Sequence, residues 1–116
     1  MKPVDVASAL LDRAAADAES LLRGLTADIS SLTDARRDAN SDDEHDPEGT
    51  TLAWERSQAD SLRLDAVARL AAVAAARARV AEGTYGTCIR CGGPIAPGRL
   101  EARPWTDRCV ACADAP

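Results

Sequence analysis

Aromatic side chains are scarce in this chain of 116 residues, which contains two Trp, one Tyr and no Phe. So few aromatic residues suit a large globular core badly. Ala, Leu, Arg, Asp and Glu dominate instead, a composition typical of long helices that pack along narrow seams. The length predicts one domain, or one domain with an extension.

The sequence also lacks the apolar segments that direct a chain into or across a membrane. Its longest apolar run, residues 70–76, is far shorter than the ~20 residues that span a bilayer. Residues 1–20 lack the order of an export signal, in which basic residues precede an apolar stretch. We therefore expect a soluble, cytoplasmic protein with no membrane partner.

The groups that usually carry catalysis are missing as well. The sequence shows no pairing of a base with a nucleophile and no phosphate-binding loop. His45 is the single histidine, and a place in a solvated loop is the better interpretation of it. The sequence therefore does not predict an enzyme.

Charge is unevenly distributed along the chain, whose formal net charge is −5. Residues 42–48 contain five acidic residues and no Lys or Arg, namely Asp42, Asp43, Glu44, Asp46 and Glu48. Residues 77–108 lean the other way, with six Arg against three acidic residues. The middle of the chain is thus acidic and the C-terminal part mildly basic.

The only four cysteines form two CxxC pairs, Cys88 with Cys91 and Cys109 with Cys112, separated by seventeen residues. This spacing is typical of a structural zinc site, because two tight turns then supply four thiolates in a tetrahedral arrangement. Disulfides are disfavoured in a cytosolic chain, and a redox-active CxxC needs no second pair. Four sulfur ligands leave no open position, so we predict one Zn²⁺ with a structural role.

Apolar residues recur in steps of four and three from about residue 4 to residue 39. The seam residues are Leu11, Ala15, Ala18, Leu22, Leu25, Ile29 and Leu32. This heptad spacing predicts one long helix with a narrow contact face. Gly24 interrupts the helix-forming residues, but the apolar pattern continues through it.

A second long helix is expected from about Pro47 to Glu82. Leu52, Ala59, Ala66, Val73 and Val80 repeat every seven residues, with Leu62 and Leu70 at intermediate positions. Asp46-Pro47 is a suitable helix start, because Asp caps free N–H groups and Pro fits the first helical position. Gly83 is a suitable stop.

Two heptad helices of nearly equal length joined by a short linker favour an antiparallel coiled-coil hairpin within one monomer. The alternative is a dimer of long helices, in which each seam meets another chain. We expect a mainly α fold, with the hairpin at residues 1–82, its tip at about 40–50, and a small four-cysteine zinc-finger module at residues 83–116. Trp54 is expected to cover the seam near the tip, with a role as a contact residue for a partner as the alternative. Tyr85 and Trp105 are expected to pack around the zinc knuckles.

The segment from Tyr85 to Ile95 reads YGTCIRCGGPI, and it is followed by RLEARP at residues 99–104 and by CVAC at residues 109–112. These motifs resemble the DksA/TraR C4-type zinc-finger family, with the match concentrated between Gly83 and Cys112. The long helices match in character only. The acidic stretch around Asp46-Pro47 is similar to the tip of actinobacterial members.

The resemblance implies a regulator of bacterial RNA polymerase. In that family the coiled coil enters the secondary channel of the enzyme, and acidic residues at its tip approach the catalytic centre. The remainder contacts the channel rim, and the alarmone ppGpp of the stringent response often takes part. The residues of this chain that would act at the polymerase active site are Asp42, Asp43, Glu44 and Asp46.

The chain departs from better-known members at two places. Those members carry a second acidic residue where Gly49 stands here, and an alanine where Thr51 stands. We also expect the last helix of larger members to be missing, since four residues follow Cys112 in this sequence. Basic residues that would serve ppGpp are limited to Arg63 and Arg69 on the second helix. We therefore do not expect the usual ppGpp site, although a ppGpp response stays open.

Two other functions remain as alternatives. A DNA-binding zinc finger would use the arginines between Arg90 and Arg108, but the net charge is negative and no basic recognition helix is evident. A coiled-coil adaptor would present the hairpin to another protein. Sequence-specific DNA binding is not expected.

Overall fold

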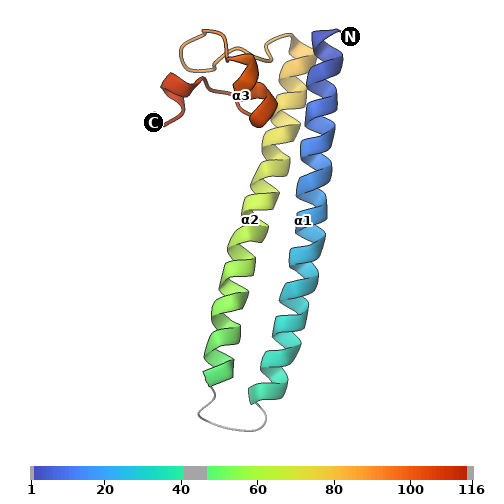
Figure 1. Ribbon diagram of the computed structural model, residues 1–116, viewed down its shortest axis with the longest axis vertical. Coiled ribbons are helices and arrows are strands. Elements are labelled where there is room, and N and C mark those ends of the chain that lie inside the picture. The colour runs from blue at the N-terminus through green and yellow to red at the C-terminus, as the bar shows by residue number, and fades with distance from the viewer. Residues whose placement is uncertain (1, 41–46, 115–116) are drawn as a thin grey trace. The chain divides into compact units, whose positions relative to one another are not determined.

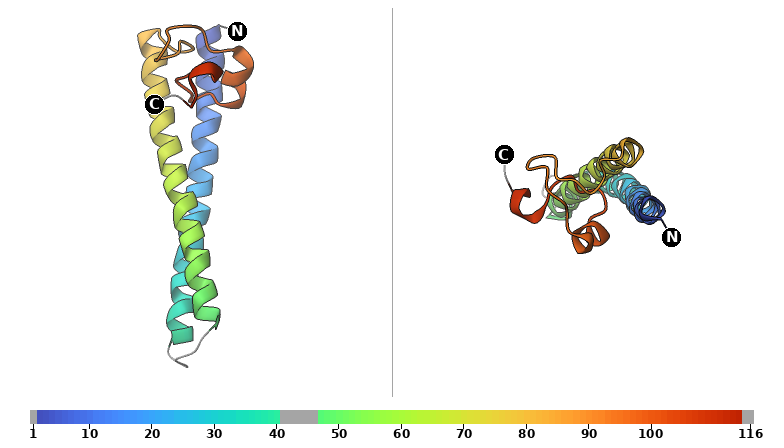
Figure 2. Two further views of the ribbon diagram at one scale, coloured as in Figure 1. Left: turned by 90° about the vertical axis from the view of Figure 1, so that its left-hand side faces the viewer. Right: turned by 90° about the horizontal axis from the view of Figure 1, so that it is seen from above.

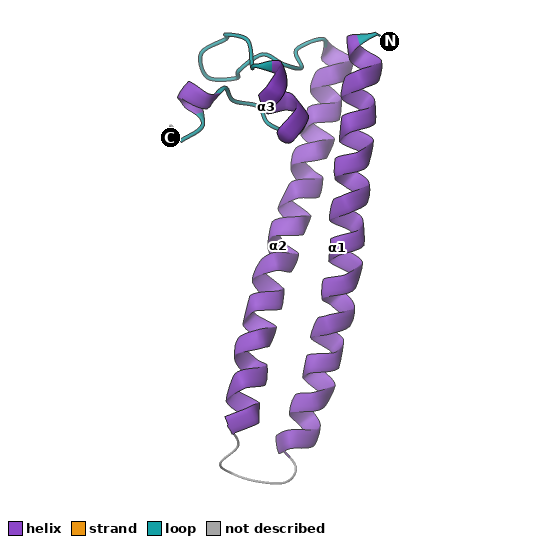
Figure 3. Cartoon of the chain, in the orientation of Figure 1, coloured by secondary structure: helices purple, strands orange, loops and turns teal. Residues whose placement is uncertain are grey.

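The structure, a computed structural model, describes residues 2–40 and 47–114 (Figure 1). Two long helices, α1 (Pro3–Asn40) and α2 (Pro47–Glu82), are followed by the short helix α3 (Pro97–Ala102) and the 3₁₀ helix η1 (Val110–Cys112). The described residues contain no strand (Figure 3), only an isolated bridge between Thr87 and Pro94. The mainly helical fold is confirmed. The predicted tip acids Asp42, Asp43, Glu44 and Asp46, and His45 with them, lie outside the described residues.

The chain divides into two compact units, and each contains part of both long helices. One unit comprises residues 18–68, and the other joins residues 1–17 to residues 69–116. In each unit α1 and α2 lie side by side and run in opposite directions (Figures 1 and 2). The predicted antiparallel hairpin is therefore present. The proposed domain boundary between residues 82 and 83 stays a prediction.

The heptad seam of α1 is buried as predicted. Leu11, Ala18 and Leu25, spaced seven residues apart, are 0%, 5% and 7% exposed. The other predicted residues of the stripe are half-buried, namely Ala15, Leu22, Ile29 and Leu32. A stripe this narrow matches contact with a single partner helix.

The α2 seam is built mainly from small residues. Ala59, Ala66 and Val73 are buried at intervals of seven residues. The prediction for Leu62 is wrong, because this side chain is 47% exposed at the edge of the seam. Small alanines bury little apolar area per layer, so this part of the hairpin gains little from the hydrophobic effect.

A hydrophobic cluster of the hairpin lies in the unit that contains the cysteines. Leu11, Val73 and Ala76 are its fully buried members, and Tyr85 and Trp105 pack against them. The prediction that these two aromatic residues surround the zinc knuckles is therefore corrected: they cover the hairpin. Because the seam of α2 is poor in large side chains, aromatic residues from outside the helices complete its core.

The prediction that Trp54 covers the seam is also wrong, since this side chain is 64% exposed. On α2 it precedes the buried residue Ala59 by five positions. Five residues correspond to about 500° of helical rotation, which is not a return to the same face. Trp54 therefore points away from the stripe that α1 covers.

The end of α2 follows the prediction made from Gly83. This glycine has a φ of +82°, in the left-handed region that glycine tolerates best. Its N–H donates to the carbonyl of Val80 (3.3 Å), and the N–H of Thr84 donates to the carbonyl of Arg79 (2.9 Å). This pair of hydrogen bonds is the Schellman motif that ends many helices. Among the described residues, no helix has the length and apolarity needed to cross a membrane.

Candidate metal centre

The first pair of cysteines lies on a tight loop between residues 86 and 95. The N–H of Ile95 donates to the carbonyl of Gly86, and the N–H of Cys88 donates to the carbonyl of Gly93; each N···O distance is 2.8 Å. The N–H of Gly92 then donates back to the carbonyl of Cys88 over 3.0 Å. Gly86 and Gly92 have φ values of +85° and +74°, so two left-handed residues allow the chain to turn around the cysteines.

The second pair lies on the 3₁₀ helix η1. Cys109 precedes this helix in an extended conformation, and Cys112 is its last residue. The N–H of Cys112 donates to the carbonyl of Cys109 (3.1 Å), which brings both thiols to one side of the turn. A further hydrogen bond joins the segments that carry the two pairs, from the N–H of Ile89 to the carbonyl of Asp107 (2.9 Å).

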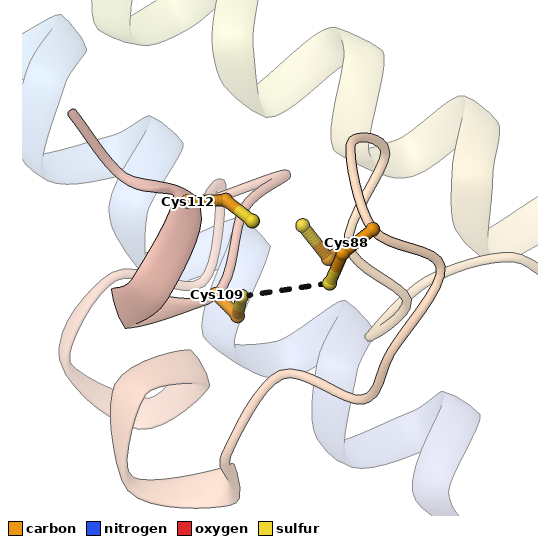
Figure 4. Close-up of side chains that lie close together, drawn as sticks. Cys88, Cys109 and Cys112 are labelled. Atoms are coloured by element: carbon orange, nitrogen blue, oxygen red, sulfur yellow. Dashed lines mark hydrogen bonds between the residues drawn. The ribbon is translucent and has the colours of Figure 1, made fainter. Parts of the chain in front are cut away.

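The four sulfur atoms lie together. All are within 4.8 Å of one another, and the side chains of Cys88, Cys109 and Cys112 point toward a common centre (Figure 4). The Sγ atoms of Cys91 and Cys109 are 3.8 Å apart. Ligands at ~2.3 Å from a tetrahedral Zn²⁺ are separated by about 3.8 Å, so this spacing fits the ion. It is far longer than the ~2.05 Å of a disulfide, and all four cysteines are free.

The backbone around the thiols makes their pKa values unequal. N–H groups of Cys91 and Cys109 hydrogen-bond to the sulfur of Cys88 and lower its pKa to about 6, because they stabilise the thiolate. The pKa of Cys112 is raised to about 11, mainly by a hydrogen bond shared with the thiol of Cys109 and then by burial. A cation at this centre would favour ionisation of all four groups.

A small hydrophobic core supports the centre. Cys88, Ile95 and Cys112 are buried together, with Leu100 from α3 packed against them. Leu100 Cδ1 would lie 3.6 Å from a Cβ added to Gly86, an ordinary contact distance, so the positive φ of Gly86 and not a lack of space favours glycine there. Four thiols converge on one point, and among the described residues no His, Asp or Glu side chain joins their group. The arrangement is therefore that of a closed structural site.

Arginines of this region form hydrogen bonds with backbone carbonyls of the protein itself. Arg79, Arg99, Arg103 and Arg108 line a cavity of about 580 Å³ between α2 and the cysteine module. Nevertheless, Arg79 donates to the carbonyls of Trp105 and Thr106, and Arg99 donates to the carbonyl of Arg108. These guanidinium groups hold the backbone of the module in place.

The two arginines considered for ppGpp also have partners. Arg63 Nε lies 3.6 Å from a carboxylate oxygen of Asp60. The guanidinium carbon of Arg69 lies 3.8 Å from the centroid of the Trp105 ring. Sequence reasoning missed this second contact, because thirty-six residues separate Arg69 from Trp105 and no local pattern joins them.

Comparison with known proteins places the cysteine module in a family. Residues 83–115 match the prokaryotic dksA/traR C4-type zinc finger. An uncharacterized protein of Aquifex aeolicus (strain VF5) is 42% identical over 55 residues, which are 47% of this chain but only 38% of that protein. The chain thus matches well under half the length of this relative.

The fold as a whole has a counterpart among solved structures. The transcription factor DksA2 from Pseudomonas aeruginosa matches with a TM-score of 0.50 and 24% identity, over 90% of this chain and 80% of DksA2. This likeness shows a shared fold. Together with the clustered thiols, the match at residues 83–115 identifies this module as a C4 zinc finger of the prokaryotic dksA/traR type with one structural Zn²⁺.

Proposed function

We propose that this protein is a bacterial transcription regulator that binds RNA polymerase and inserts the turn of its hairpin into the secondary channel to modulate initiation. The observation that carries the proposal is an antiparallel two-helix hairpin followed by a C4 zinc finger in one chain. The transcription factor DksA2 supports it by its similar fold, and the dksA/traR zinc-finger match at residues 83–115 supports it independently. Cys88, Cys91, Cys109 and Cys112 are the proposed ligands of the zinc ion.

The hairpin suits insertion into a channel for a physical reason. Two paired helices are narrower than a globular domain, and the turn that joins them enters first. Residues 42–46 carry four carboxylates, on Asp42, Asp43, Glu44 and Asp46. Negative charge near a centre built around Mg²⁺ and basic side chains changes the local electrostatic potential. The tip then acts by shifting the population of polymerase conformations, and no covalent step is required.

In this proposal the zinc finger has a mechanical role. Its aromatic residues Tyr85 and Trp105 complete the core between α1 and α2, while the metal fixes the loops from which they extend. The finger therefore stabilises the part of the hairpin that contains the start of α1 and the end of α2. The rest of the module contacts the channel rim.

The test is in vitro transcription with the cognate polymerase, with and without ppGpp. A tip variant changes Asp42, Asp43 and Asp46 to Asn and Glu44 to Gln. Its matched control removes the same number of charges from exposed acids of the helices, through Asp28→Asn, Asp34→Asn, Glu55→Gln and Asp65→Asn. We expect the tip variant to bind polymerase but lose its effect on transcription, and the control to keep it.

Two results would contradict the proposal. Failure of the wild-type protein to bind polymerase at low salt would remove the proposed partner. Full transcriptional activity of the tip variant, with polymerase binding retained, would leave the partner in place but exclude the proposed role of the carboxylates.

A further inference from the structure

The segment between α3 and Cys109, residues 103–108, is held by α2 on one side; we call it the connecting segment. Arg79 Nη2 donates to the carbonyls of Trp105 (3.2 Å) and Thr106 (3.4 Å). Tyr85, three residues beyond the end of α2, donates its hydroxyl to the carbonyl of Pro104 (2.8 Å). Three consecutive carbonyls of the connecting segment are therefore bound by side chains from α2 or its C-terminal extension.

The ring of Trp105 is a contact between the connecting segment and the hairpin. It packs against the buried cluster of Leu11, Val73 and Ala76. The guanidinium carbon of Arg69 lies 3.8 Å from the ring centroid, and that of Arg103 lies 5.6 Å from it. Both distances fall within the range of cation–π attraction. Apolar packing and cation–π contacts therefore both hold the Trp105 ring in place.

On its other side the connecting segment is joined to both pairs of cysteines. The carbonyl of Asp107 accepts a hydrogen bond from the N–H of Ile89 (2.9 Å), the residue after Cys88. The carbonyl of Arg108 accepts one from Arg99 Nε (2.8 Å), immediately before Cys109. The backbone that carries Trp105 therefore continues directly into the proposed metal ligands.

We propose that the connecting segment couples zinc binding to the docking of Trp105 on α2, so that loss of the metal releases the contact between Arg69 and Trp105. A metal bound to both cysteine pairs fixes the end of the connecting segment at Cys109 and the neighbouring hydrogen bond at Ile89. Without the metal, that end loses its strongest restraint. Arg69, Arg79 and Trp105 are positioning residues in this scheme, and none of them touches the ion.

Thermodynamic linkage makes the coupling reciprocal. If zinc strengthens the docking of Trp105 by some factor, the docking must strengthen zinc binding by the same factor. Variants that weaken the docking should therefore lower zinc affinity, although they lie outside the site. Contacts that merely stabilise the hairpin, without connection to the metal, would leave the affinity unchanged.

The test measures zinc affinity of the full chain by competition with a chelating dye. Arg69→Ala removes the cation–π contact and should weaken zinc binding about threefold. Arg79→Met removes two hydrogen bonds from a charged donor while keeping an apolar stem, and should weaken it about tenfold. The control is Arg77→Ala, which removes another α2 arginine that pairs with Asp12; its affinity should equal that of the wild type.

A second measurement follows Trp105 directly. In a Trp54→Phe background Trp105 is the only tryptophan, and chelation of zinc should shift its emission to longer wavelength as the ring becomes exposed to water. The shift should be smaller in Arg69→Ala, where the ring is already less protected. Unchanged emission on chelation would overturn the proposal. So would unchanged zinc affinity in both Arg69→Ala and Arg79→Met, even if their melting temperatures fell.

Discussion

Arg77 and Asp12 join the two long helices across sixty-five residues of sequence: Arg77 Nη1 donates to Asp12 Oδ1 over 2.7 Å. The pair lies beside the buried cluster of Leu11 and Ala76, one residue further along each helix. It therefore marks the register in which α1 and α2 meet near the zinc finger. Its side chains are 47% and 66% exposed, so water and salt screen the attraction.

Arg77→Ala should lower the free energy of unfolding by no more than about 1 kcal/mol, because an exposed ion pair contributes little. Asp12→Asn should have a similar effect, and the double variant should cost less than the two changes added together. Urea denaturation at low salt measures these differences. The coupling should shrink at high salt, and a coupling that is insensitive to salt would contradict this account of the pair.

Leu11→Ala should lower the free energy of unfolding by about 3 kcal/mol, because it leaves a cavity in the hydrophobic cluster that Leu11 forms with Val73 and Ala76. Leu11 is fully buried there, with 0% of its surface exposed. Leu21→Ala makes the same chemical change on α1, but Leu21 is 51% exposed, and we expect a change within about 0.5 kcal/mol. Equal losses at the two positions, measured by urea denaturation, would contradict the assigned seam.

Replacing two glycines by alanine should change stability in opposite directions. Gly24 lies within α1 with no atom near the position of an added Cβ, so Gly24→Ala should stabilise the protein by about 0.5–1 kcal/mol. Gly83 also has free space but a φ of +82°, so Gly83→Ala should destabilise it by about 1 kcal/mol. Thermal unfolding of the zinc-bound protein measures both changes, and a gain at Gly83 would exclude the left-handed helix end.

Features that repeat locally along the chain were predictable from the sequence. Heptad spacing located the buried face of α1, and Asp46-Pro47 and Gly83 located the start and end of α2 within a residue. The spacing of the paired cysteines was enough to predict a zinc site, because ligand spacing is itself a local property. In each case neighbouring residues carry the whole signal.

Features that depend on contacts between distant segments were not predictable. Tyr85 and Trp105 flank the cysteines in sequence, yet they pack on the hairpin, since the alanine-rich face of α2 leaves space there. Trp54 is exposed for the complementary reason, because its helical position faces away from α1. The function of the acids at residues 42–46 remains a prediction, because a charge run shows where carboxylates lie in the chain and not what they approach.

Zinc affinity should fall as the pH falls, because the ion binds thiolates and must displace any proton they hold. The pKa of Cys112 is raised to about 11, so at neutral pH this thiol releases a proton on binding. The affinity should therefore drop at least about tenfold for each unit of pH between roughly 8 and 7. Below about pH 6, the pKa to which Cys88 is lowered, a further proton must leave and the dependence of zinc affinity on pH should steepen.

Dye competition across this pH range measures the slope, with His45→Ala as a control that should leave the slope unchanged. An affinity independent of pH would mean that the thiols are already ionised before the metal arrives, contrary to the shared hydrogen bond that protects the proton on Cys112.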